Sequence, residues 1–239
     1  MVKNMNNDQN NKKEKTYEIV PAFKDTIFSD ELKDSITDVV EAGLDYFMEF
    51  NPFLESIPIV RIIYGLGKTT FNIQERNFLI QTAGFMEGFY VQNVDKEKLK
   101  AYKEKLRNNP NQEDKELSRV IILLDRYYDY RKSRMLGLLF NKYIEDQIDW
   151  EDFCEYSDLI TNLYIRDIDY LLKTFENKGL DAEESNKHIY VRLQGLGLVT
   201  ISEGLKKQGY TTNFITGTHV EITDYGKRFS KLITEEKKL

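Results

Sequence analysis

The sequence is short of the residues that usually carry metal or thiol chemistry. It contains one cysteine, Cys154, and two histidines, His188 and His219, among 239 residues. A single thiol cannot close an intrachain disulfide, and no Cys-x-x-Cys or Cys/His spacing indicates a zinc site. The sequence therefore indicates neither a disulfide-stapled protein nor a zinc site built from Cys and His, and we predict a cytoplasmic chain without a cofactor.

Long apolar runs are also lacking. The most apolar stretch, residues 52–66, is interrupted by Glu55, Pro58 and Arg61, whereas a membrane-spanning helix requires about 20 apolar residues. Residues 1–16 are polar and rich in Asn and Lys, so they contain no signal peptide and are predicted to be a disordered tail. We expect no membrane span.

Recognisable catalytic motifs are missing as well. Gly67-Lys68-Thr69 resembles the end of a phosphate-binding loop, but Ile62 stands where that motif requires glycine, and the preceding residues predict a helix. The acidic pair Asp125 and Asp129 is typical of a solvated helix face, since no His or Cys completes a site. The net charge of −6 argues against a nucleic-acid footprint over the whole chain. We therefore predict a protein that is not an enzyme.

What the sequence does contain is helical periodicity, and the fold class we predict is mainly α. Residues 17–178 are expected to form a helical domain, because apolar residues recur every three or four positions and 41% of the chain is hydrophobic. Asn72 with Glu75 is typical of a capping box. The predicted helices cover residues 29–48, 58–66, 72–89, 94–107, 117–128, 135–144 and 149–175, with a loop at 108–111 and no clear period in 17–28.

Two of these predicted helices, 58–66 and 72–89, are apolar over more than half of their circumference. A helix that packs on one side only needs a narrower apolar face than this. The extra apolar surface therefore predicts an interface for a protein partner or for self-association. The residues predicted for this interface are Ile59, Ile62, Ile63, Phe78, Phe85 and Phe89. An alternative that we keep is perturbation of a membrane by the same segment.

The pattern changes beyond Gly179, where residues 179–239 predict a small α+β module. A helix over 185–195 is followed by a strand over 198–202, a polar loop over 204–213 and a strand over 219–222. Thr223 is expected to cap a final helix. This order predicts a winged-helix-like module with a two-stranded wing.

Two short runs, Leu193–Val199 and Ile222–Gly226, resemble the recognition-helix end and the last-helix start of winged-helix regulators of the multiple-antibiotic-resistance type. That resemblance implies contact with DNA through one helix and the wing. The residues it implies are Lys187, Tyr190, Arg192 and Gln194 in the major groove, and Lys206 and Lys207 at phosphates.

The charge of this module weakens the implication that it contacts DNA. Residues 188–239 contain eight Lys/Arg and five Asp/Glu, and the segment 179–184 carries Glu183 and Glu184 where such regulators have a supporting helix. The module is therefore expected to be either a DNA reader or a wing that docks onto protein.

The middle of the chain is similar to a group of bacterial proteins associated with prophages and defence islands. The likeness lies in residues 57–60, 73–79, 123–127, 136–143 and 148–153. It implies no catalytic residues. We predict a non-enzymatic regulatory or interaction protein of a prophage or an anti-phage defence locus, which acts by protein docking or self-association. The alternatives are a winged-helix transcription regulator, a membrane-perturbing abortive-infection effector and an enzyme with a metal site built from carboxylates.

Overall fold

The computed structural model describes residues 19–29, 57–64, 72–207 and 214–234. The chain divides into two compact units, Met1–Gln147 (unit 1) and Ile148–Leu239 (unit 2). Residues 148–178, which the sequence placed in the helical domain over 17–178, therefore group with the C-terminal sheet. The predicted tail lies outside the described residues, and so does the helix predicted over 29–48, apart from Ser29.

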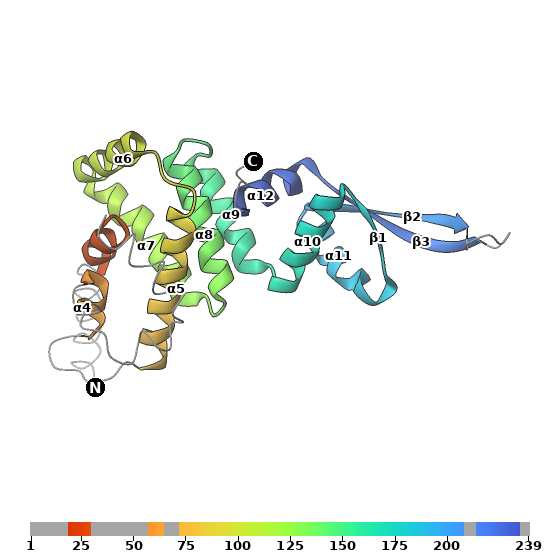
Figure 1. The fold of residues 1–239 in the computed structure, drawn as a ribbon, viewed down its shortest axis with the longest axis horizontal. Helices are drawn as coiled ribbons and strands as arrows, with labels where there is room; N and C mark the ends of the chain where they lie inside the picture. The colour runs from red at the N-terminus through yellow and green to blue at the C-terminus, as the bar shows by residue number, and fades with distance from the viewer. Residues whose placement is uncertain (1–18, 30–56, 65–71, 208–213, 235–239) are drawn as a thin grey trace, which may run out of the picture. The chain divides into compact units, whose positions relative to one another are not determined.

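Every regular element described in unit 1 is a helix (Figure 1). The elements are a helix over residues 19–27, α4 (Pro58–Tyr64), α5 (Ile73–Tyr90), α6 (Lys96–Asn108), α7 (Pro110–Arg126) and α8 (Tyr130–Ile144). The helix over 19–27 was not predicted, although Val20, Phe23 and Ile27 form its buried side. Where we predicted a loop at 108–111, only Asn109 separates α6 from α7, and its side chain caps α7.

The capping box predicted at the start of α5 is confirmed. The Asn72 side chain accepts a hydrogen bond from the Glu75 amide (2.9 Å), and the Glu75 carboxylate accepts one from the Asn72 amide (3.0 Å). We expect Asn72→Ala to lower the free energy of unfolding by about 1 kcal/mol, because an amide of the first turn loses its partner. Chemical denaturation checks this value. Asn111→Ala, in the first turn of α7, is the control and should cause no loss.

The centre of unit 1 is the contact between α5 and α8. A Cβ atom at Gly88 would lie 1.9 Å from the carbonyl oxygen of Arg134, and one at Gly137 would lie 2.0 Å from that of Phe85. Any larger residue at either position would therefore force the two backbones apart. The rings of Phe85 and Phe140, with centroids 5.5 Å apart, pack beside this close approach.

The predicted interface in this region is largely wrong, because most of its residues lie in the core of unit 1. Four of the six are at most 5% exposed: Ile59, Phe78, Phe85 and Phe89. Ile62 is 39% exposed, and the side chain of Ile63 lies outside the described residues. The wide apolar arc of α5 is explained by contacts with both α7 and α8. In the described part of the chain, no helix is both long enough and apolar enough to cross a membrane.

Unit 2 combines helices with a small sheet. Its elements are α9 (Trp150–Asn162), α10 (Ile165–Asn177), β1 (Leu180–Ala182), the 3₁₀ turn η2 (Glu184–Asn186), α11 (Lys187–Gly195), β2 (Val199–Lys207), β3 (Phe214–Ile222) and α12 (Asp224–Ile233). The cap predicted at Thr223 is confirmed, since its side chain accepts from the amide of Gly226, and Asp149 caps α9 in the same way through the amide of Asp152.

The single helix predicted over residues 149–175 is wrong, because the chain is extended at Leu163 and Tyr164 between α9 and α10. Asp167 stabilises the new start, since its carboxylate accepts a hydrogen bond from the Tyr164 amide (3.4 Å). Leu163 and Ile168 are both buried, so the apolar stripe continues across the break and conceals it in the sequence.

The sheet is antiparallel with strand order β1-β3-β2. β2 and β3 pair over nine residues, from Val199↔Ile222 to Lys207↔Phe214. β1 was not predicted, and it adds three pairs to the other edge of β3. The described chain is thus mainly helical, as predicted, with a small C-terminal three-stranded antiparallel sheet among helices.

Candidate interaction surface on helix α11

Helix α11 is anchored in unit 2 by one buried face. Ile189, Tyr190 and Leu193 are at most 1% exposed, and α11 contacts both α10 and β2. The ring of Tyr190 meets that of Tyr170 edge-on, with centroids 5.6 Å apart. Burial raises the pKa of the Tyr190 hydroxyl. The spacing of these residues places the opposite face of α11 toward solvent.

That opposite face consists of exposed side chains one helical turn apart. His188, Val191 and Gln194 are all exposed, and Val191, at 53%, is among the most exposed large apolar side chains described. An apolar residue between two polar ones gives the face a non-polar centre with hydrogen-bonding groups on either side. This composition suits contact with a protein surface better than contact with phosphate.

One edge of the exposed face is an ion pair between α11 and β2. The Lys187 ammonium donates to the Glu203 carboxylate at 2.7 Å. This hydrogen bond raises the pKa of Lys187 and lowers the pKa of Glu203. The positive charge of Lys187 is thus matched by a negative charge within the same unit.

The other edge is formed by Arg192. Its guanidinium donates two hydrogen bonds to the Asp167 carboxylate, from Nε at 3.1 Å and from Nη2 at 2.5 Å. The hydrogen bond to Asp167 raises the pKa of Arg192. The guanidinium also lies 5.2 Å from the ring centroid of Tyr164, which is 66% exposed. Arg192 therefore contacts both Asp167 on α10 and Tyr164, the residue directly before α10.

The residues implied as DNA contacts are thus divided by the structure. Gln194 lies on the exposed face, whereas Lys187 and Arg192 at its edges are bound to carboxylates. The structure contradicts the DNA contact implied for Tyr190, because its side chain is only 1% exposed and cannot reach into a groove. Lys206 and Lys207 belong to β2, and their side chains lie outside the described residues.

Sequence reasoning missed the residues that neutralise these cations. Asp167 is 1% exposed and Glu203 is exposed on β2. Asp167 stands three residues after Tyr164, which is the N-cap-to-N3 spacing of a capping box, but tyrosine is not a usual N-cap residue, so this spacing did not indicate a helix start at 165. Nothing in the sequence indicated that the same carboxylate would bind Arg192, which lies 25 residues further on.

The remaining ionisable cluster of unit 2 lies on the sheet. His219 on β3 is 2.9 Å from the Asp181 carboxylate on β1 and 3.6 Å from that of Glu221. Within the described ranges, no group of three or more His, Cys, Asp or Glu side chains is arranged to hold a metal ion. Of these two contacts, the one with Asp181 crosses from β3 to β1. Comparison of the chain with protein-family models, with curated proteins and with solved structures gave no match.

Proposed function

We propose that this chain is a non-enzymatic interaction protein of the cytoplasm, whose unit 2 is a winged-helix-like module that docks onto another protein through the exposed face of α11. The observation that carries the proposal is the pairing of both edge cations with carboxylates of the same unit, around a solvent-exposed Val191.

Element order supports the winged-helix-like description. α10 is followed by β1, α11, the β2–β3 hairpin and α12, with α11 in the place of a recognition helix. The one-turn η2 stands where such modules have a supporting helix. A module of this kind without a full supporting helix is better suited to a docking role than to reading a DNA groove.

Charge supports protein over DNA as the partner of this face. A DNA-reading helix presents free cations to phosphate, whereas Lys187 and Arg192 would have to exchange Glu203 and Asp167 for a phosphate group. The face instead offers an apolar centre at Val191, flanked by His188 and Gln194. We infer a partner that presents an apolar side chain to Val191 and hydrogen-bonding groups around it.

A crosslinking experiment with matched variants tests the proposal. A photoreactive residue at Gln194 should crosslink the full chain to a defined protein in cells of the native host. Val191→Glu should abolish that product, because it places a charge at the centre of the contact. Ile122→Glu is the matched control, since Ile122 on α7 is 50% exposed and lies on unit 1. It should leave the crosslink intact.

Two results would contradict the proposal. The first is a crosslink pattern that Val191→Glu leaves unchanged. The second is duplex DNA binding by the full chain that falls when His188 and Gln194 are replaced by alanine, which would make α11 a DNA reader. Sedimentation velocity of the wild type separates docking onto a different protein from self-association, since only the latter depends on the concentration of this chain alone.

A further inference from the structure

Helix α6 in unit 1 has a charge opposite to that of the chain as a whole. Its thirteen residues contain six Lys or Arg and two Glu, whereas the whole chain has a net charge of −6. Its large apolar residues, Leu99, Tyr102 and Leu106, are buried in unit 1. The concentration of positive charge on one short helix is a local property that the overall acidity conceals.

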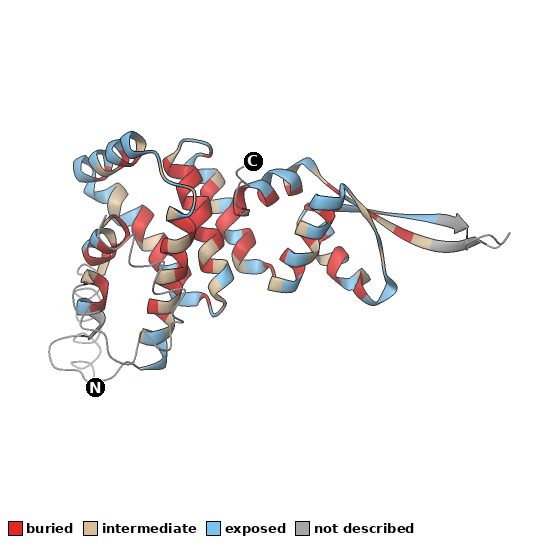
Figure 2. Cartoon of the chain, viewed as in Figure 1, coloured by how far each residue is buried: buried red, intermediate tan, exposed pale blue. Residues whose placement is uncertain are grey.

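Four of these cations fall on one line along the helix. Lys96, Lys100, Lys103 and Arg107 are spaced by four, three and four residues, so they lie on one face of α6. At about 1.5 Å of rise per residue, this basic stripe extends over about 17 Å. Much of α6 is exposed along its outer side (Figure 2).

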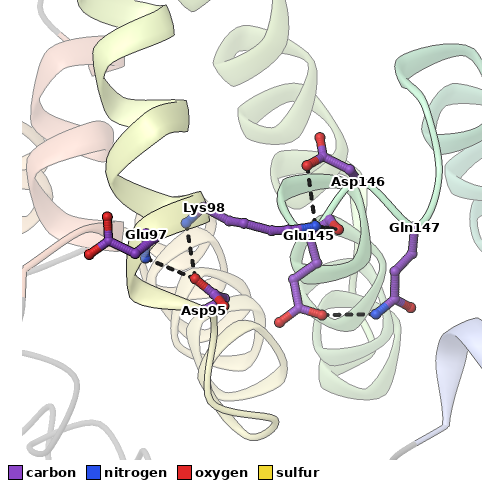
Figure 3. Close-up of polar contacts among 6 residues, drawn as sticks. All are labelled: Asp95, Glu97, Lys98, Glu145, Asp146 and Gln147. Carbon is purple, nitrogen blue, oxygen red and sulfur yellow. Dashed lines mark hydrogen bonds and ion pairs between the residues drawn. The ribbon is translucent and has the colours of Figure 1, made fainter.

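The other two cations are bound within unit 1. Lys98 donates to the carbonyl oxygen of Glu145 at the end of α8 and pairs with Asp146 at 3.3 Å (Figure 3). Lys105 donates to the Tyr143 hydroxyl at 3.3 Å. Both side chains therefore stabilise the attachment of α6, and they are separate from the stripe.

Most of the stripe has no such partner. The side chains of Lys96, Lys100 and Arg107 are exposed and form no hydrogen bond or ion pair with any residue that the structure describes. Lys103, at the border with the core, donates to the carbonyl oxygen of Phe28 at 3.1 Å. Three cations in a row are thus available to an external anion.

We propose that the basic stripe of α6 binds the phosphate backbone of duplex nucleic acid without reading its sequence. A row of phosphates is a linear polyanion, and Lys and Arg on a helix face neutralise it by releasing counterions. The stripe presents no exposed aromatic side chain for stacking on unpaired bases, which favours a duplex over a single strand. Glu97 and Glu104 lie along one side of the stripe and limit the contact to a narrow track.

Other polyanions fit the stripe less well. A helix that binds a membrane surface inserts its apolar face, but the apolar face of α6 is buried in unit 1. A protein interface has an apolar or aromatic centre, and Ala101 is the only apolar residue of α6 that is exposed. Contacts with phosphate require neither an exposed apolar face nor an aromatic centre. The chemistry of the stripe therefore favours the nucleic-acid backbone as its ligand.

Fluorescence anisotropy of a labelled 30-base-pair duplex of random sequence tests the inference with the full chain. Binding should weaken steeply between about 50 and 200 mM salt. The triple variant Lys96→Gln, Lys100→Gln and Arg107→Gln should bind at least about tenfold more weakly and lower the log–log salt slope by about 3, at about 0.9 for each phosphate contact. Its thermal stability should match the wild type, because these side chains are exposed.

A matched variant removes the same charge elsewhere. Lys115→Gln, Arg126→Gln and Lys231→Gln replace exposed cations, and Arg126 occupies the last turn of α7 as Arg107 does that of α6. This control should retain wild-type binding and slope. Absence of binding by the wild type at low salt, or equal losses in both triple variants, would overturn the inference.

Two further outcomes also decide against it. Displacement of the duplex by polyglutamate at equal charge concentration would make the stripe a site for acidic proteins. Loss of binding on Val191→Glu with retention in the α6 variant would move the nucleic-acid site to α11. The inference does not depend on the function proposed for α11, because the two surfaces lie on different units and are tested with different variants.

Discussion

Gly88→Ala is expected to lower the free energy of unfolding by about 3 kcal/mol, at the upper end of the usual cost of overpacking a core. Alanine is normally favoured over glycine inside a helix by about 1 kcal/mol. The change in the free energy of unfolding expected here therefore has the opposite sign to the general rule. The reason is steric, since the new methyl group would lie 1.9 Å from the Arg134 carbonyl oxygen on α8. Gly137→Ala should have a similar effect through the Phe85 carbonyl oxygen. Far-UV circular dichroism during denaturation measures both.

Gly195→Ala provides the control for this prediction. Gly195 also lies in a helix, but no atom lies within 4 Å of the position that a Cβ would take. We expect this variant to be neutral or more stable by up to about 1 kcal/mol. If Gly88→Ala and Gly195→Ala were equally stable, the close contact between α5 and α8 would not hold in solution.

Arg192→Ala is expected to destabilise unit 2 by about 2 kcal/mol. It leaves the Asp167 carboxylate, with a side chain only 2% exposed, without its bidentate partner. Breaking a fully buried pair costs roughly 3–5 kcal/mol. The Arg192 side chain is 39% exposed, so water screens the pair and reduces the effect. The fluorescence of Trp150, the only tryptophan of the chain, reports the unfolding of unit 2.

Lys187→Ala distinguishes this effect from a general loss of positive charge on α11. Its pair with Glu203 is open to solvent, with side chains 32% and 57% exposed, so we expect no detectable change in the unfolding midpoint. The double variant Arg192→Met with Asp167→Leu should recover most of the stability, because no uncompensated charge remains. A stable Arg192→Ala protein with weakened DNA binding would instead assign Arg192 to a nucleic-acid contact.

Features set by neighbouring residues could be predicted from the sequence. Asn72, Asp149 and Thr223 all act as helix caps, because capping depends on side chains and amides only two or three residues apart. The mainly helical fold and the presence of the β2–β3 hairpin follow from local periodicity in the same way, although the strands predicted over 198–202 and 219–222 are shorter than β2 and β3.

Features that depend on distant residues could not be predicted. The sequence shows that α5 is apolar on most sides, but it does not show whether another helix or solvent covers Phe85 and Phe89, and α8 covers them. Tyr190 was placed on the exposed face for a similar reason, because the register of α11 against α10 is set by tertiary contacts. The three-residue β1 is too short to show a period and forms only because β3 offers an edge.

The junction at Asn109 has a consequence for how the chain can vary in length. One residue ends α6 and begins α7, so the two helices share a fixed rotational phase. An insertion of one residue in the last turn of α6 would turn the preceding part of the helix by about 100° and bring Lys100 and Lys103 into the place of Leu99 and Tyr102. The most loop-like sequence of unit 1 is therefore a poor site for an inserted tag, a new terminus or a natural insertion.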